Sequence, residues 1–266
     1  MKVFLDLNHK IVINGTMVLS ICIDSCVRGM SDSEALDMVK AAGFSAFEFW
    51  IWQNRDMDAL AEKAKDLGLN CVGFCTKSFN LTDPGQREVF LEGLKESIVQ
   101  AKKMGAPCLM TQSGNDTGAV RPFQHRSIAA GLKAAAPLLE DAGVTLVLEP
   151  LNSKINHPAI YLESSDEGFD IIKEVGSGNV KLLFDIYHQQ ITEGDIIRRM
   201  TSHIELIGHI HCAGNPGRHE LDSGELDFKR IFRALEKADY KGYAGIEYSP
   251  AEPPMEGFKR LREMVA

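Results

Sequence analysis

The sequence predicts a single (β/α)8 barrel, the α/β fold also called a TIM barrel, over the whole of residues 1–266. Short runs of apolar and β-branched residues alternate about eight times with longer amphipathic runs. The short runs are apolar at successive positions, as parallel strands buried on both faces require. No change of composition and no low-complexity linker divides the chain, so we expect one domain.

The first unit of the barrel follows an N-terminal segment, residues 1–16, that we interpret as an additional β-hairpin. A strand is expected at residues 18–24. Ser31 and Glu34 then show the pattern of a capping box, in which each side chain bonds the backbone N–H of the other residue. The helix that they open runs through Ala42 and ends at Gly43, because glycine readily adopts the left-handed conformation that closes a helix.

The later strands and helices alternate in the same way to the end of the chain. Strands are expected at residues 46–50, 70–76, 108–112, 145–151, 180–188, 206–214 and 243–250. Helices are expected at residues 56–68, 87–104, 127–142, 166–175, 195–201, 228–238 and 255–264. An open doubly wound sheet is the alternative fold, but the first helix lacks the GxGxxG motif that often opens such a sheet.

The overall composition is that of an ordinary globular protein, with 44% hydrophobic and 25% charged residues. The formal net charge of −8 argues against nucleic acid as a partner, since a phosphate backbone binds a basic surface. No apolar run is long enough to span a bilayer, and residues 1–15 lack the apolar centre of a signal peptide. We therefore expect a cytoplasmic protein that acts on small molecules, with no membrane partner.

The six cysteines contain no CxxC pair, and most of them lie within apolar runs. This pattern favours free, buried thiols in a reducing compartment over disulfides or a thiolate zinc site. The cysteines are Cys22, Cys26, Cys71, Cys75, Cys108 and Cys212.

Four consecutive predicted strands end in side chains that can bind a metal ion: Glu149, Asp185, His211 and Glu247. A single acidic residue at such a position is usually a helix cap or a solvated loop residue. Four on neighbouring strands of a barrel share one rim, where three carboxylates would repel one another. A divalent cation removes that repulsion, and three oxygen ligands with one nitrogen suit Mn²⁺, Mg²⁺ or Co²⁺ better than a structural zinc ion.

Other polar and aromatic residues are candidates for contact with a substrate at this rim. His188 follows a predicted ligand closely, and Arg218 has the planar fork that binds a carboxylate. Glu48 is a charge within an apolar strand, so it needs a partner or a wet pocket, and Trp50 is a candidate pocket wall. Each also has an ordinary structural explanation, and His209 is left without a role.

Taken together, these residues resemble the hydroxypyruvate isomerase-like group of the xylose isomerase-like sugar isomerase/epimerase superfamily. The matching motifs are RGMSDSEAL, AGFSAFEFW, LEPLNSK, NVKLLFDIYHQQITEGD, GHIHCAGNPGRHELDSGELDF and GIEYSP. They span nearly the whole chain from about Val18, and the block that begins at Asn215 is the most specific of them.

The resemblance implies one divalent metal ion on the four strand-end residues, and a small sugar or keto-acid substrate. It also implies that Glu149 and Glu247 are the two proton-transfer groups, and that His188 and Arg218 hold the substrate. The expected activity is isomerisation through a cis-enediolate, most closely of hydroxypyruvate to tartronate semialdehyde, by a protein that can associate with itself.

Three alternatives stay open at this point. His211 matches the ketose 3-epimerases of the superfamily, whereas hydroxypyruvate isomerases often have glutamine there, so an epimerase of an unphosphorylated ketose is the second candidate. A metal-binding barrel subunit that depends on a partner is the third. Apurinic endonucleases share the superfamily, but they need more histidine ligands and a basic groove than this acidic chain offers.

Overall fold

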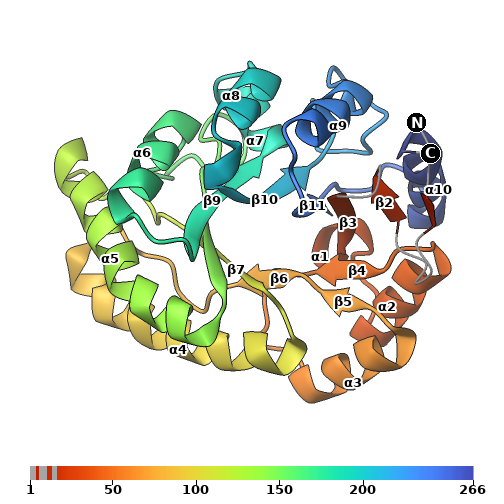
Figure 1. The fold of residues 1–266 in the computed structure, drawn as a ribbon, viewed down its shortest axis with the longest axis horizontal. Helices are drawn as coiled ribbons and strands as arrows, with labels where there is room; N and C mark the ends of the chain where they lie inside the picture. The colour runs from red at the N-terminus through yellow and green to blue at the C-terminus, as the bar shows by residue number, and fades with distance from the viewer. Residues whose placement is uncertain (1–3, 6–10, 14–16, 266) are drawn as a thin grey trace.

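The computed structural model describes residues 4–5, 11–13 and 17–265. Parallel strands stand in the centre and helices surround them, as Figure 1 shows. The barrel strands are β3 (Met17–Cys22), β4 (Ala46–Glu48), β5 (Asn70–Cys71), β6 (Gly73–Cys75), β7 (Cys108–Gln112), β8 (Thr145–Glu149), β9 (Val180–Asp185), β10 (Ile207–Cys212) and β11 (Tyr243–Ile246).

The strands pair in the order expected of a closed barrel. The sheet runs β3-β11-β10-β9-β8-β7-β6, and β4 pairs with both β3 and β5. Only Val72 separates β5 from β6, and the backbone N–H of Phe49 donates to the carbonyl of Gly73 across this junction. With β5 and β6 counted as one strand position, the barrel has eight, and the predicted (β/α)8 class is confirmed.

Most of the predicted helices are present within one or two residues of their expected bounds. The helices are α1 (Ile23–Cys26), α2 (Asp32–Ala41), α3 (Met57–Leu67), α4 (Arg87–Met104), α5 (Arg121–Ala142), α6 (Ser165–Val175), α7 (Ile186–Thr192), α8 (Ile196–Ser202), α9 (Phe228–Lys237) and α10 (Pro254–Val265). The capping box at Ser31 is formed with both of its hydrogen bonds. Helix α5 begins six residues before the expected start, and a proline lies in its first turn, where the missing N–H costs nothing.

The expected strand at residues 180–188 was too long. Strand β9 ends at Asp185 and α7 begins at once, with the Asp185 side chain accepting a hydrogen bond from the backbone N–H of His188 at 3.0 Å. A short apolar run does not distinguish strand from helix, and aspartate is a strong N-cap. His188 therefore lies in the first turn of a helix.

The N-terminal segment pairs with the barrel as a β-ribbon. Strands β1 (Phe4–Leu5) and β2 (Ile11–Ile13) are antiparallel, and β2 pairs antiparallel with the first residues of β3. The turn of the hairpin expected over residues 1–16 lies outside the described residues. The six cysteines are free, as expected. Among the described residues, no helix has the length and apolarity needed to cross a membrane.

Gly73, the first residue of β6 after Val72, allows strands β6 and β7 to approach closely. A Cβ atom on Gly73 would lie 2.7 Å from the carbonyl oxygen of Cys108, closer than real contacts allow. We expect Gly73→Ala to lower the free energy of unfolding by about 1–3 kcal/mol, because the strand must move to relieve the overlap. Denaturant unfolding followed by circular dichroism measures this change.

Gly178 provides the matched control for this substitution. A Cβ there would meet nothing within 4 Å, and its φ is not positive. Gly178→Ala should change the free energy of unfolding by no more than about 0.5 kcal/mol. Equal effects of the two substitutions would contradict the packing explanation.

Candidate active site

The four strand-end residues converge at one end of the barrel, although they are distant in sequence. Glu149 ends β8, Asp185 ends β9, His211 lies in β10 and Glu247 directly follows β11. All four are buried, and one potential ligand atom from each lies within 4.8 Å of the others. Adjacent strands are in register here, with His211 beside Asp185. The register of the parallel strands therefore brings these four side chains together.

The chemistry of this group fits a divalent cation. His211 Nδ1 lies 3.3 Å from Glu247 Oε2 and 3.6 Å from Glu149 Oε1. It is buried and has no hydrogen-bond partner among the described residues, although such an atom usually has one. Three carboxylates and one imidazole are ligands that manganese, magnesium or cobalt ions accept.

Two carboxylates of this group, Asp185 and Glu247, differ in how far their surroundings compensate their burial. Burial raises the pKa of Asp185 more than the neighbouring Arg218 lowers it, and Glu247 adds a smaller rise. Burial would also raise the pKa of Glu247, but Arg218 and His211 hold it well below its usual range. A cation bound among these carboxylates would stabilise the ionised form of Asp185 as well.

Arg218 lies against the carboxylates rather than free in the cavity. Its Nη2 atom pairs with Glu247 and lies 3.5 Å from Asp185 Oδ2, and its guanidinium group stacks over the ring of Tyr187. Its backbone φ is +57°, next to a glycine that also has a positive φ. The loop thus directs a permanent cation to the edge of the candidate metal site, where it can also meet a substrate oxygen.

His188 is held as a neutral hydrogen-bond donor. Its Nδ1 atom accepts from the backbone N–H of Asn152 at 3.2 Å, so the ring proton lies on Nε2. Burial lowers the pKa of His188 to about 3, more than the nearby carboxylates raise it. The Nε2–H group can therefore donate to a substrate oxygen without carrying charge.

A cavity of about 560 Å³ opens over this group. Among the predicted site residues, Glu149, His188, His211, Arg218, Glu247 and Trp50 line it. The Trp50 indole N–H also donates to Glu247, so Trp50 both forms the wall and orients a carboxylate.

The sequence did not single out several other residues of the cavity wall. They include Thr76, Lys77, Gln112, Leu151 and His157. Thr76 directly follows β6, and Gln112 ends β7 in register with Glu149. Both could have been found by extending the search of strand ends to the first half of the chain.

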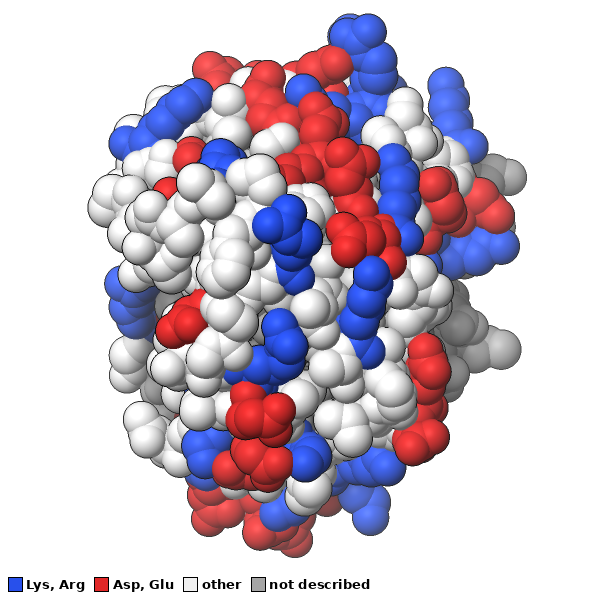
Figure 2. All heavy atoms as spheres, turned by 90° about the vertical axis from the view of Figure 1, so that its left-hand side faces the viewer, with Lys and Arg blue, Asp and Glu red and all other residues white. Residues whose placement is uncertain are grey.

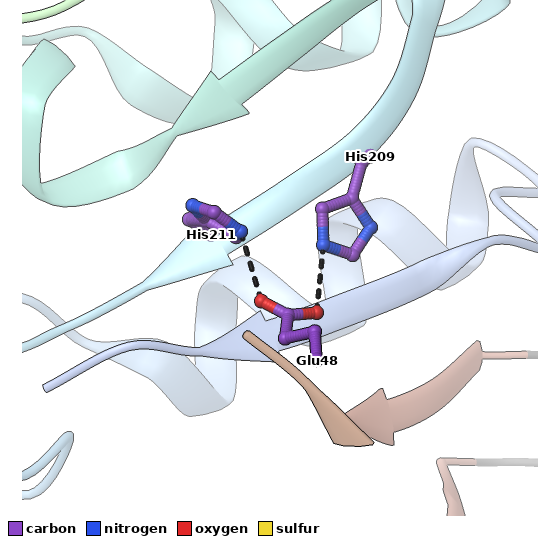
Figure 3. Close-up of side chains that lie close together, drawn as sticks. All are labelled: Glu48, His209 and His211. Carbon is purple, nitrogen blue, oxygen red and sulfur yellow. Dashed lines mark hydrogen bonds and ion pairs between the residues drawn. The ribbon is translucent and has the colours of Figure 1, made fainter. Parts of the chain in front are cut away.

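Glu48 lies beneath the cavity rather than in its wall. Its side chain is 1% exposed and lies between His209 and His211, as Figure 3 shows. Burial would raise the pKa of Glu48, but the two imidazoles lower it to about 2. The expected contact of Glu48 with a substrate has no support from this position, while His209 acquires a definite partner.

Comparison with known proteins identifies related sequences. Residues 36–264 match the xylose isomerase-like TIM barrel family. The chain is 32% identical over 242 residues to a human protein provisionally named hydroxypyruvate isomerase, and the match covers 84% of this chain and 87% of the relative. It is 43% identical over 172 residues to a 2-oxo-tetronate isomerase of Cupriavidus necator, over 63% of this chain and 64% of the relative.

A solved structure shares nearly the entire fold. The crystal structure of an AP endonuclease of family 2 from Brucella melitensis matches with a TM-score of 0.89 and 25% sequence identity. The match covers 93% of this chain and 98% of that chain.

We expect one Mn²⁺ ion to bind per chain in isothermal titration calorimetry. At a free Mn²⁺ concentration of 100 times Kd, the protein should gain about 2.7 kcal/mol of stability, because the ion binds the folded state alone. Asp185→Asn should weaken Mn²⁺ binding by at least about 100-fold, since losing a direct ligand costs no less than losing an outer partner.

Glu163 supplies a control for the loss of a carboxylate, because it pairs with Ser153 outside the metal-binding group. Glu163→Gln should bind Mn²⁺ as the unaltered protein does. Unchanged Mn²⁺ binding by Asp185→Asn would contradict the assignment of this site.

Proposed function

The chain belongs to the xylose isomerase-like TIM barrel family, and from this premise we propose that it is a divalent-metal-dependent isomerase of short 2-oxo acids, closest to hydroxypyruvate isomerase. The observation that carries the proposal is that Glu149 and Glu247 both line the cavity with a carboxylate oxygen close to His211 Nδ1, at 3.6 Å and 3.3 Å. The curated relatives support the substrate class, because hydroxypyruvate and 2-oxo-tetronate are both 2-oxo acids with a hydroxyl group beside the ketone.

A divalent cation held by Glu149, Asp185, His211 and Glu247 would polarise the ketone and the adjacent hydroxyl group and stabilise the negative charge of an enediolate. The protein residues then have to move one proton between adjacent carbon atoms. One of the two glutamates removes a proton from C3 of hydroxypyruvate, and the C–H electron pair forms the enediolate. Return of a proton to C2, with transfer of the O3 proton to O2, gives tartronate semialdehyde.

His188 and Arg218 support the negative charge that develops on the substrate oxygens. Nε2 of His188 carries the ring proton, since Nδ1 accepts from Asn152, and it lies 3.7 Å from Asp185 Oδ2 at the edge of the cavity. Arg218 stays protonated and lies beside Glu247, where its remaining N–H groups can meet a carboxylate or an enediolate oxygen. Donors fixed in place before the reaction lower the barrier because they need no reorganisation.

A ketose 3-epimerase is the second candidate. Epimerisation needs two proton-transfer groups on opposite faces of one carbon atom, and Glu149 and Glu247 come from strand positions separated by β9 and β10. The same geometry supports both reactions, so the difference lies in where the second proton is delivered. Incubation in D₂O separates them, because isomerisation labels the neighbouring carbon and epimerisation labels the inverted one.

Nucleic-acid cleavage, the activity for which the structural neighbour from Brucella melitensis is named, is disfavoured by charge. The chain carries a net charge of −8. The face drawn in Figure 2 shows acidic and basic side chains interspersed, without a continuous basic stripe. A phosphate backbone would gain little from binding such a surface.

Glu247→Gln and Glu149→Gln, assayed with saturating Mn²⁺, should each lower kcat for hydroxypyruvate by about 10²–10⁴-fold, because each removes a proton-transfer group. Proton NMR in D₂O measures both turnover and deuterium incorporation. Glu163→Gln, outside the site, should keep the activity of the unaltered protein. Full activity of Glu247→Gln at confirmed metal occupancy would refute the two-glutamate mechanism.

The same assay decides between a catalyst and a partner-dependent subunit. The purified chain, fully loaded with Mn²⁺, should convert at least one compound in a panel of short 2-oxo acids and ketoses. Inactivity across this panel would favour a subunit that works only with another protein.

A further inference from the structure

A buried carboxylate beneath the cavity has no role in the reaction described above. Glu48 Oε1 lies 2.9 Å from His211 Nε2, and Glu48 Oε2 lies 3.0 Å from His209 Nε2. Glu48 Oε2 also accepts a hydrogen bond from the Ser20 hydroxyl at 2.6 Å. Figure 3 shows the carboxylate between the two rings, with one oxygen directed at each. A charge so deeply buried is costly unless it is paired, and here the Ser20 hydroxyl and two imidazoles face it.

The contact with Glu48 determines which nitrogen of His211 is available. An imidazole coordinates a cation through an unprotonated nitrogen, and the hydrogen bond of the other nitrogen sets the tautomer. The carboxylate beside Nε2 favours the proton there. Nδ1, on the opposite edge of the ring, lies 3.6 Å from Glu149 Oε1 and 3.3 Å from Glu247 Oε2, within the group that could hold the cation.

We propose that Glu48 is a positioning residue, which holds the His211 ring from below through Nε2 so that Nδ1 is presented to the divalent cation, while His209 and Ser20 fix the orientation of Glu48. The proposal rests on the metal site of the proposed function. It replaces the expected contact of Glu48 with the substrate by a contact with a metal ligand.

Gly245 gives independent support for this arrangement. His211, Gly245 and Ser20 are register neighbours on β10, β11 and β3, so a side chain at 245 would stand between the other two. A Cβ on Gly245 would lie 2.3 Å from Glu48 Oε1 and 2.7 Å from His211 Cδ2. Its φ is not positive, so the backbone conformation does not call for glycine. The missing side chain provides the space in which Glu48 reaches His211.

Glu48→Gln tests the proposal, because it keeps the size of the side chain and removes the charge that orients both rings. We expect its affinity for Mn²⁺, measured by isothermal titration calorimetry, to fall about 10–100-fold. Excess Mn²⁺ should restore most of kcat for hydroxypyruvate and leave KM unchanged, since Glu48 does not touch the substrate. Because Mn²⁺ also stabilises the folded state, this rescue supports the proposal only for a variant that circular dichroism shows to be folded without the ion.

Gly245→Ala tests the same contact from a different strand, and should weaken Mn²⁺ binding in the same direction. Glu193→Gln is the control for loss of a partly buried carboxylate, because Glu193 pairs with Arg199 and belongs neither to the four-residue candidate metal site nor to the second set that could hold a metal ion, Glu48, His209 and His211. It should bind Mn²⁺ as the unaltered protein does. Circular dichroism of the metal-free variants checks that each is folded.

If Glu48→Gln does not fold, Ser20→Ala decides, because it removes only the hydroxyl donor to Glu48. A loss of Mn²⁺ affinity of at least about twofold, which corresponds to the low end of the net contribution of one hydrogen bond, supports the proposal, and no loss overturns it. Unchanged affinity of folded Glu48→Gln also overturns it. Binding of two Mn²⁺ ions per chain, with the second lost in His209→Gln, would also overturn the proposal. Glu48, His209 and His211 would then form a metal site themselves.

Failure of this proposal differs from failure of the proposed function. If the chain binds Mn²⁺ and Glu48→Gln binds it weakly, the positioning role stands even when no 2-oxo acid or ketose is converted. If the chain is an active isomerase and Glu48→Gln binds Mn²⁺ normally, only the positioning role fails. If the unaltered chain binds no divalent cation, both fail.

Discussion

Four carboxylates are buried at one end of the barrel, and the arrangement of the site follows from the need to keep them ionised. Removing a carboxylate from water costs several kcal/mol, so each must meet positive charge or hydrogen-bond donors. Glu48 meets two imidazoles and a hydroxyl group, and Glu247 meets Arg218 and the Trp50 indole. Asp185 meets Arg218 and the backbone N–H of His188, but burial raises its pKa more than these partners lower it. The divalent cation completes this balance in the proposed function.

Strand register places the opposing charges at the same level. Asp185, His211, Gly245 and Ser20 are successive neighbours across four strands, so one layer of the barrel contains two candidate metal ligands, a glycine and a hydrogen-bond donor. The absence of a side chain at Gly245 matters as much as the side chains present, because Glu48 from strand β4 occupies that space. The site is thus continuous with the packing of the barrel interior.

The sequence was sufficient to predict the fold and the four candidate ligands because both depend on a local pattern. Apolar runs mark the strands, and a polar residue at the end of a run lies at the rim in any parallel barrel. The helix after Asp185 was missed, since capping by a side chain outweighed a strand-like run. The inward orientation of Glu48 could not be predicted. The residues around it in the strand are apolar on both faces, so the sequence does not reveal which side chains point inward. Contacts from loops, such as Asn152 to His188, also have no local signal.

Asp185 both belongs to the candidate metal-binding group and caps helix α7, through the bond that it accepts from the backbone of His188. Selection for a stable fold would therefore preserve this aspartate in a descendant that had lost catalysis altogether. An aspartate at this position in a related sequence is therefore only weak evidence that the relative is an enzyme. His211 and Glu247, which cap no helix, are the positions by which a degenerate relative would be recognised first.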